Sequence, residues 1–450
     1  MSGWPRPIYG RGPRGNRKAT QAMRRSPLLP IFLTVFVDVL GLTLILPLLP
    51  YYAKDYGGTD VVAGALMAVY AACMFVSGPV LGRLSDRFGR KPILLVSQLG
   101  TLAGWLILAG STSLQMLFLG RIIAGLTAGN LSIAQAYISD VTKPNEERTQ
   151  AFGFFGIAFG TGFLLGPWIS GLLTAFAKGH HDLMARYQIV EGVPEKLYKY
   201  QLPSLTAAAL SLCAILLTIF VLPARKPSAG GSAARRSFAF KQFLSRPAPR
   251  KRLTEFFLFS LSFSALTGGL SLYLQHRFGF DAEHAGYIFG LSGLIGAVVQ
   301  GGPLRKLARR FGEERLAMIG LGAMAIGNGL LGFAYSLSFL LVLVVIGAFG
   351  AAVVRPSITT LVTRTVSPPE QGSVLGVSQS LGSLAQIAGP LVASWLIGRE
   401  HLGIYGAFCG GFSLLGLFTL LQRPEPPASV EIASADEPPA PMREAPRASA

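Results

Sequence analysis

The sequence predicts an all-α polytopic membrane protein, with twelve transmembrane helices arranged as two pseudo-symmetric six-helix bundles. Three observations lead to this fold class. The 450 residues are 51% hydrophobic and only 14% charged, whereas about 25% of the residues in a soluble domain carry a charge. Long apolar stretches recur from one end of the chain to the other. The second half also repeats residues of the first half at a constant spacing.

Twelve apolar stretches approach or exceed the length of about 20 residues that a helix needs to cross a membrane. They cover residues 28–50, 61–82, 92–110, 114–139, 149–176, 203–222, 253–275, 284–304, 316–334, 338–362, 372–398 and 404–422. The sequence then divides into five segments. These are a basic N-terminal segment (1–27), a first bundle (28–222), a basic linker (223–252), a second bundle (253–422) and a Pro-rich tail (423–450) whose composition predicts disorder.

The distribution of Lys and Arg predicts the orientation of these spans. With the N-terminus in the cytoplasm, the cytoplasmic segments hold 31 of the 40 basic residues and the opposite side holds 7, while Arg121 and Arg355 lie within spans. Basic residues accumulate on the cytoplasmic side of membrane proteins. We therefore expect a multi-pass protein of the cell (inner) membrane with both termini in the cytoplasm. The net charge of +18 reflects this topology, and nucleic acid is not an expected partner.

The two halves repeat each other at an offset of 223 residues. Residues 87–89 (Arg-Phe-Gly) recur at 310–312, and residues 166–167 (Gly-Pro) recur at 389–390. Duplicated bundles of this kind place a substrate site between the halves, near the middle of the bilayer.

Asp38 is the only carboxylate well inside a predicted span, roughly 15 Å from its cytoplasmic end. An acid at that depth is costly when charged and marks a functional site. Arg121 lies at a similar depth in span four and is the expected partner. An ion pair between them would favour proton release from Asp38, and its rupture would favour uptake. A structural hydrogen bond for Asp38, or a fixed ion pair, is the alternative.

Arg355, in span ten next to Pro356, is the second unexpected charge. If it faces the central cavity it would favour anionic or carbonyl-rich substrates; alternatively it extends toward the cytoplasmic face or pairs with an acid there. Uncharged polar residues inside spans either line the cavity or form bonds between helices. The predicted cavity residues among them are Asn130, Gln135, Asn328 and Gln379. Gln300 and Gln386 likewise either line the cavity or form bonds between helices. Glu255, which follows three basic residues, is expected at the membrane surface.

Residues 82–92, with the sequence G-R-L-S-D-R-F-G-R-K-P, join spans two and three. A turn that only sets topology explains the bases, but it does not explain the acid or the glycines. Gly82, Asp86, Arg87, Gly89, Arg90 and Lys91 therefore need a further explanation, and the family resemblance described below implies that they form a gating motif. The second half has Arg309 where the first has Asp86, so the gate is expected to be asymmetric.

Four motifs carry a resemblance to a known family. Residues 82–92 match the loop 2–3 signature of the major facilitator superfamily, and residues 38–50, 119–125 and 162–171 resemble motifs of its twelve-span drug/proton antiporter branch, which includes tetracycline and multidrug efflux proteins. The resemblance implies that Asp86 meets the cytoplasmic start of span eleven, near Gly372. It also implies an antiporter motif, formed by Gly162, Gly166, Pro167 and Gly171. Close helix packing alone is the alternative for these small residues.

One departure limits the resemblance. Tetracycline antiporters carry an acid in span nine, but residues 316–334 hold no ionisable side chain, so metal–tetracycline chemistry is not carried over. We expect proton-coupled efflux of small amphipathic compounds by alternating access. The expected partners are the substrate, protons and the lipid bilayer; the protein is expected to be a monomer without metal or cofactor, and no catalytic constellation suggests an enzyme. The alternatives are uptake or exchange of an organic anion, and a non-transporting membrane sensor or scaffold.

Overall fold

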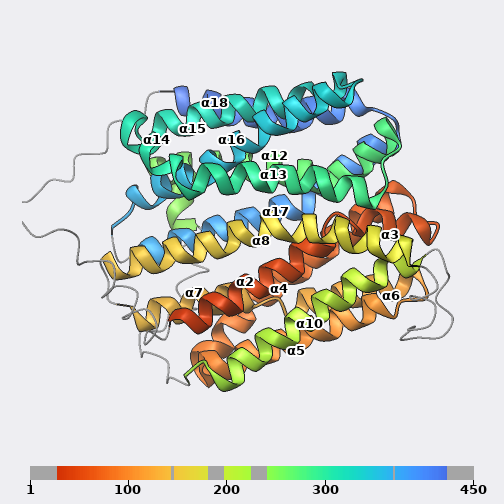
Figure 1. Cartoon of the computed structure of the whole chain (residues 1–450). Helices are drawn as coiled ribbons and strands as arrows, with labels where there is room; N and C mark the ends of the chain where they lie inside the picture. Colours follow the sequence, from red (N-terminus) through yellow and green to blue (C-terminus); the bar gives the residue numbers. More distant parts are fainter. Residues whose placement is uncertain (1–27, 143–145, 181–196, 224–240, 368–369, 423–450) are drawn as a thin grey trace, which may run out of the picture.

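The computed structural model describes residues 28–142, 146–180, 197–223, 241–367 and 370–422. Its helices in the first half are α2 (Leu28–Ile45), α3 (Leu49–Asp55), α4 (Asp60–Phe88), α5 (Arg90–Ala109), α6 (Leu114–Leu126), α7 (Asn130–Val141), α8 (Glu146–Gly179) and α10 (Tyr198–Phe220). Those in the second half are α12 (Pro247–Phe278), α13 (Ala282–Gly301), α14 (Pro303–Phe311), α15 (Glu313–Gly329), the 3-10 turn η2 (Leu330–Phe333), α16 (Leu337–Arg364), α17 (Gln371–Gly398) and α18 (Leu402–Leu421). Within the described residues, twelve helical segments are long and apolar enough to cross a membrane, and Figure 1 shows them as two adjacent bundles.

Two predicted spans are interrupted. The span expected over 28–50 ends at Ile45, and α3 starts after a short turn that contains Pro47, which lacks an N–H for a continuous helix. The span expected over 114–139 is split at residues 127–129 into α6 and α7. There the Ser97 hydroxyl donates to the Thr127 carbonyl and accepts from the Gly129 N–H at 2.9 Å. A side chain from another helix thus satisfies backbone groups that lipid could not.

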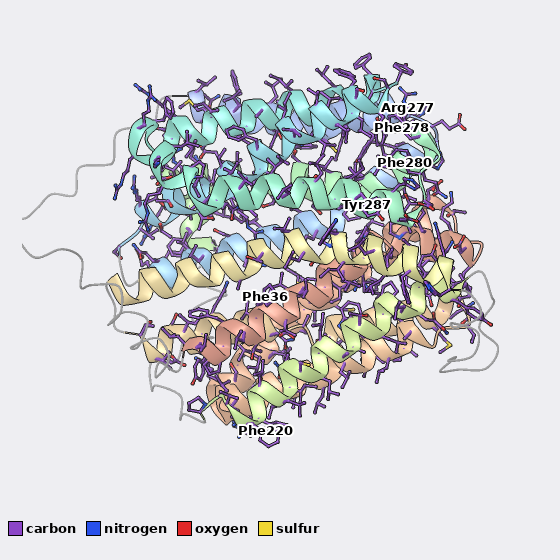
Figure 2. All side chains as sticks on the ribbon, in the orientation of Figure 1. Phe36, Phe220, Arg277, Phe278, Phe280 and Tyr287 are labelled. Atoms are coloured by element: carbon purple, nitrogen blue, oxygen red, sulfur yellow. The ribbon has the colours of Figure 1, made fainter. Side chains whose placement is uncertain are left out.

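The second half also departs from the predicted boundaries. The span expected over 284–304 ends at Gly301, and its remainder belongs to the separate helix α14. Helix α12 begins at Pro247, so the final residues of the expected linker (223–252) are helical. The expected N-terminal segment and tail lie outside the described residues, as does most of the linker. Figure 2 shows Phe220 at one end of the molecule, and Arg277, Phe278, Phe280 and Tyr287 at the other.

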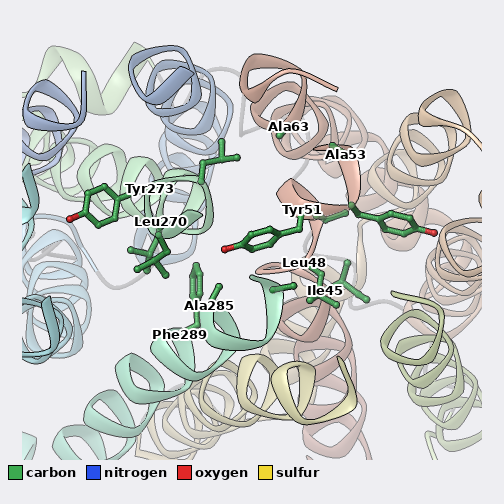
Figure 3. Close-up of a cluster of buried hydrophobic side chains, with 14 of the residues drawn as sticks. Ile45, Leu48, Tyr51, Ala53, Ala63, Leu270, Tyr273, Ala285 and Phe289 are labelled. Carbon is green, nitrogen blue, oxygen red and sulfur yellow. The ribbon is translucent and has the colours of Figure 1, made fainter. Parts of the chain in front are cut away.

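The two halves are joined at one end of the molecule. We call this the closed end; it contains the turns at residues 56–59 and 279–281. One hydrophobic cluster there includes buried side chains of both halves, among them Tyr51, Leu270 and Phe289 (Figure 3). The Tyr51 hydroxyl donates to the Ser271 carbonyl at 3.0 Å, and the Ser271 hydroxyl donates to the Pro47 carbonyl at 3.0 Å.

Charged side chains reinforce the closed end. Lys178 of the first half pairs with Asp281 and, at 3.4 Å, with Glu283 of the second half. His276 of the second half lies 3.3 Å from Asp60 of the first, which also accepts from Lys54 at 2.8 Å.

At the opposite end each half has a hydrophobic cluster of its own. We call this the basic end; it contains the turns around Gly89 and Gly312. One cluster there lies wholly in the first half and includes Ile31 and Tyr137. The other lies wholly in the second half and includes Leu253 and Val374. The shared core at the closed end and the separate cores at the basic end show that buried hydrophobic contact between the halves is concentrated at the closed end.

Candidate functional site

Asp38 lies in α2 with both carboxylate oxygens inaccessible and without a hydrogen-bond partner within the described part of the chain. The side-chain amides of Gln98 in α5 and Asn130 at the start of α7 are its polar neighbours, but neither completes a hydrogen bond of good geometry. The break between α6 and α7 places Asn130, the first residue of α7, next to the Asp38 carboxylate. The helix dipole favours negative charge at the start of a helix.

Arg121 in α6 is only 3% exposed, and its guanidinium lies over the Tyr70 ring of α4 at 4.2 Å from the ring centre. Its Nε and Nη1 atoms have no hydrogen-bond partner in the described structure. The predicted ion pair between Asp38 and Arg121 is thus not formed in this conformation. Tyr70 lies within electrostatic reach of both groups. Within the described structure, a buried carboxylate and a buried guanidinium of one bundle therefore do not pair with each other, an arrangement that favours protonation or a change of contacts.

Sequence reasoning did not single out Gln98 and Tyr70. Gln98 is a fully buried polar residue inside span three, so its polarity within an apolar stretch was an available signal. Tyr70 belongs to span two, where an aromatic residue is unremarkable, and its stacking on Arg121 depends on the packing of α4 against α6. That contact could not be read from the sequence.

The glycines of the antiporter motif pack α8 against α2, directly beside Asp38. A Cβ atom on Gly162 would lie 2.7 Å from Val39 Cγ1, and one on Gly166 would lie 2.9 Å from the Leu44 nitrogen. The Thr43 hydroxyl donates to the Gly162 carbonyl at 2.8 Å. Close approach of the two backbones therefore requires glycine at both positions.

The other part of this motif contacts the second half. A Cβ atom on Gly171 would lie 3.1 Å from the Glu283 carbonyl oxygen, and one on Gly286 would lie 2.9 Å from the Pro167 carbonyl oxygen. Helices α8 and α13 run side by side at this boundary (Figure 1). One helix therefore packs both on the helix of Asp38 and on the opposite half.

Helix α17 has a polar face directed toward the first half. Pro390 and Ser394 on this face approach Gly64 of α4 at the closed end. Gln379 and Gln386 lie on the same face, eleven and four residues before Pro390, and both are exposed. The exposed apolar residues Leu384 and Trp395 lie on the opposite face. One face of α17 therefore meets lipid, while the other is accessible inside the molecule.

The remaining predicted cavity residues differ in their surroundings. Arg355 is exposed although it lies nine residues from the nearer end of helix α16, and Gln135 is half-buried. Asn328 is 2% exposed, and its Oδ1 would be 2.6 Å from a Cβ atom on Gly347. Asn328 thus lies buried between α15 and α16 in this conformation.

The predicted gating motif forms a compact charge network at the basic end. Gly89 joins α4 to α5 with φ = 100°, in the region that favours glycine. Asp86 accepts from Arg90 at 2.5 Å, and Arg90 also donates to Asp140 at 2.8 Å. Lys91 donates to two carbonyl groups at the end of α10, each at 2.8 Å.

The remaining members of the gating motif are Arg87 and Gly82. The Arg87 guanidinium lies 5.3 Å from the Phe88 ring centre, and Gly82 is half-buried within α4. The expected contact of Asp86 with span eleven is not made here, since a Cβ atom on Gly372 would meet nothing within 4 Å in the described structure.

Comparison with known proteins agrees with this architecture. The sequence model of the Major Facilitator Superfamily matches residues 31–306 and 301–449. The chain belongs to this superfamily. It is therefore a multi-pass membrane transporter by family and fold, as the four sequence motifs indicated.

Three similar proteins carry information about function. The chain is 31% identical over 377 residues to the tetracycline resistance protein, class C, of Escherichia coli, covering 82% of this chain and 88% of the relative. It is 29% identical over 445 residues to the major facilitator superfamily domain-containing protein 10 of Homo sapiens, covering 88% and 93%. A crystal structure of the human organic anion transporter MFSD10 (TETRAN) is similar with a TM-score of 0.64 and 27% identity, covering 87% of this chain and 98% of that one.

Proposed function

We propose that this superfamily member is a proton-coupled exporter of small amphipathic compounds that works by alternating access. The observation that carries the proposal is the Asp38 carboxylate, which lies inside a membrane span with both oxygens lacking hydrogen-bond partners. Protonation removes the cost of a buried charge, so a group in this position exchanges a proton when its surroundings change. The similarity to tetracycline resistance proteins supports export.

In the proposed cycle the basic end faces the cytoplasm, as the distribution of Lys and Arg predicts. The structure then corresponds to a state that is closed to the outside. Asp38 is separated from Arg121, which lies over Tyr70, and this separation favours the protonated acid. Movement of the halves that brings Arg121 to Asp38 would favour proton release. The contacts of Gly162 and Gly166 with α2 and of Gly171 with α13 give α8 a part in both events.

The gating motif acts as the latch of the opposite state. Helices α4 and α17 are antiparallel, and Gly64 meets Ser394 at the closed end. Asp86 lies twenty-two residues after Gly64, and Gly372 lies twenty-two residues before Ser394. Closure of the basic end along this register would bring the Asp86 carboxylate to the first turn of α17, where free N–H groups bind anions.

A second candidate function is exchange or uptake of an organic anion. It is favoured by Arg355, an exposed guanidinium in the middle part of α16, and by similarity to a protein described as an organic anion transporter. Residues of the accessible face of α17, such as Gln379, would then contact the substrate together with Arg355.

Proton release measured on addition of compounds to the purified protein separates these functions. The panel contains amphipathic cations and organic anions, and the proteins are wild type, Asp38→Asn and the control Glu313→Gln, which removes an acid at the first residue of α15, at the basic end. We expect release with amphipathic cations from wild type and the control, and none from Asp38→Asn. Release with anions alone would favour the second function. If no compound moves protons in wild type, proton-coupled export is contradicted.

A further inference from the structure

The short helix α14 (Pro303–Phe311) places four basic side chains on the surface of the basic end. These are Arg305, Lys306, Arg309 and Arg310, and all four are exposed. We call this group the α14 patch. The other side of the helix carries Leu304, Leu307 and Ala308, which pack against the hydrophobic cluster of the second half. The helix is therefore held to the protein by its apolar side, with its charges directed outward.

The α14 patch is not neutralised by the part of the chain that the structure describes. Among the described residues, none of its four members forms an ion pair, and the contact of Arg310 is with the Phe311 ring at 5.5 Å. Glu314, the second of two acids that follow α14 in the chain, accepts from Arg252 at 2.8 Å and not from the α14 patch. Arg252 in turn donates to the fully buried Glu255 at 3.0 Å.

The corresponding turn of the first half behaves differently. There Asp86 pairs with Arg90, and Arg90 pairs with Asp140. In the second half Arg309 occupies the position of Asp86 in the repeat, so an internal counter-charge is replaced by another cation. Arg90 is in turn replaced by Glu313 in the repeat, and Arg309 forms no ion pair among the described residues, so the second turn lacks the ion-paired network of the first.

The position of α14 indicates what meets this charge. Helix α13, a candidate membrane span, ends at Gly301, and the next candidate span begins at Glu313. The α14 patch thus lies at the level where a membrane span gives way to water. Phospholipid headgroups occupy this level, and basic residues there attract anionic lipids. Amphipathic helices with a basic polar face lie in the same interface.

We propose that the α14 patch is a binding surface for anionic phospholipid headgroups. The phosphodiester oxygens would accept from the Arg305, Arg309 and Arg310 guanidinium groups, whose donors match phosphate geometry, and Lys306 would add a point charge. The exposed side of Phe311 would contact the adjoining acyl chains. This surface is independent of the substrate site between the halves.

Native mass spectrometry of the full-length protein, titrated with phosphatidylglycerol or phosphatidylcholine, tests the proposal. The test variant replaces all four residues of the α14 patch with Gln. The matched control replaces four other exposed basic residues, Arg83, Lys241, Arg250 and Arg364, with Gln. We expect the test variant to lose about tenfold in apparent affinity for phosphatidylglycerol, with phosphatidylcholine binding unchanged. The control is expected to keep most of its affinity.

Two further variants separate charge from packing. Replacement of the three arginines of the patch with Lys keeps the charge and is expected to retain binding within about twofold. The single change Arg309→Asp, which copies the first half, is expected to weaken phosphatidylglycerol binding several-fold, and it keeps the proposal testable if the fourfold variant does not fold. Equal losses in the test variant and the control would assign binding to diffuse charge and overturn the proposal, as would undiminished binding by the test variant.

Discussion

The two basic turns occupy equivalent positions in the repeat, yet they differ in structure and charge. In the first half, α4 continues as one helix to Phe88, and Asp86 and Asp140 both pair with Arg90 within that half. In the second half the equivalent segment separates from α13 as α14, and its four bases have no ion pair in the described residues. The repeat exchanges Asp86 for Arg309 and Arg90 for Glu313, which removes the ion pair that the first turn forms. Duplication thus preserved the frame of the turn while its two copies acquired different partners.

The largest expected effect comes from the ion pairs that support each turn. In the second half Glu255 is fully buried and held by Arg252, and Glu255→Ala leaves the buried Arg252 guanidinium with only the more exposed Glu314 as a partner, so we expect a loss of about 3 kcal/mol. In the first half Asp140 is more exposed, and Asp140→Asn is expected to cost about 1 kcal/mol or less. Thermal unfolding of the purified variants measures both. Equal losses would contradict the difference in burial between the two networks.

The closed end provides the next comparison, because its charges cross between the halves. Burial alone would raise the pKa of Asp281, but hydrogen bonds from Lys178 and His284 hold that pKa well below its usual range. A carboxylate with a lowered pKa stabilises its contacts above its ordinary pKa of about 3.9 and loses this contribution only as the pH falls through the lowered value. The ion pair between Lys178 and Asp281 therefore contributes a constant amount to the stability of the closed end between pH 5 and pH 8.

Cysteine labelling near the closed end tests the contribution of Asp281. Replacement of Asp281 with Asn should increase labelling severalfold at every pH in this range, because Lys178 then loses its strongest partner. Glu313→Gln, at the basic end, serves as the control and should leave labelling at the closed end unchanged. A wild-type protein whose labelling rises sharply between pH 8 and pH 5 while Asp281→Asn stays flat would show that Asp281 titrates in this range.

The smallest expected effects concern single bases. Lys91 donates to two carbonyl groups at the end of α10, and Lys91→Gln is expected to cost about 1 kcal/mol in the free energy of unfolding. Arg305→Gln removes an exposed base of α14 and should change that free energy by less than about 0.5 kcal/mol. Chemical denaturation of the two variants in detergent micelles measures both changes in the free energy of unfolding. A larger loss for Arg305→Gln would show that α14 has a structural partner.

The sequence was sufficient for the fold class, the spans and the position of Asp38 inside one of them, because these depend on local composition and on spacing. It was insufficient wherever a distant residue decides the outcome. The break at residues 127–129 is stabilised by Ser97 of another helix, and burial of Glu255 depends on Arg252 and, through it, on Glu314. The burial of Asn328 between α15 and α16 could not be predicted either, because a helix that is apolar on all sides gives no sign of which side faces a cavity.

A distance measurement across the basic end tests most directly the claim that only the first-half turn acts as a latch. Spin labels at Val80 and Arg364, both exposed, would be introduced after replacement of the three native cysteines with Ser. We predict two distance populations in wild type and in Arg309→Gln, with loss of the shorter one in Asp86→Asn. Persistence of the shorter distance in Asp86→Asn, or its equal loss in both variants, would contradict the one-sided latch.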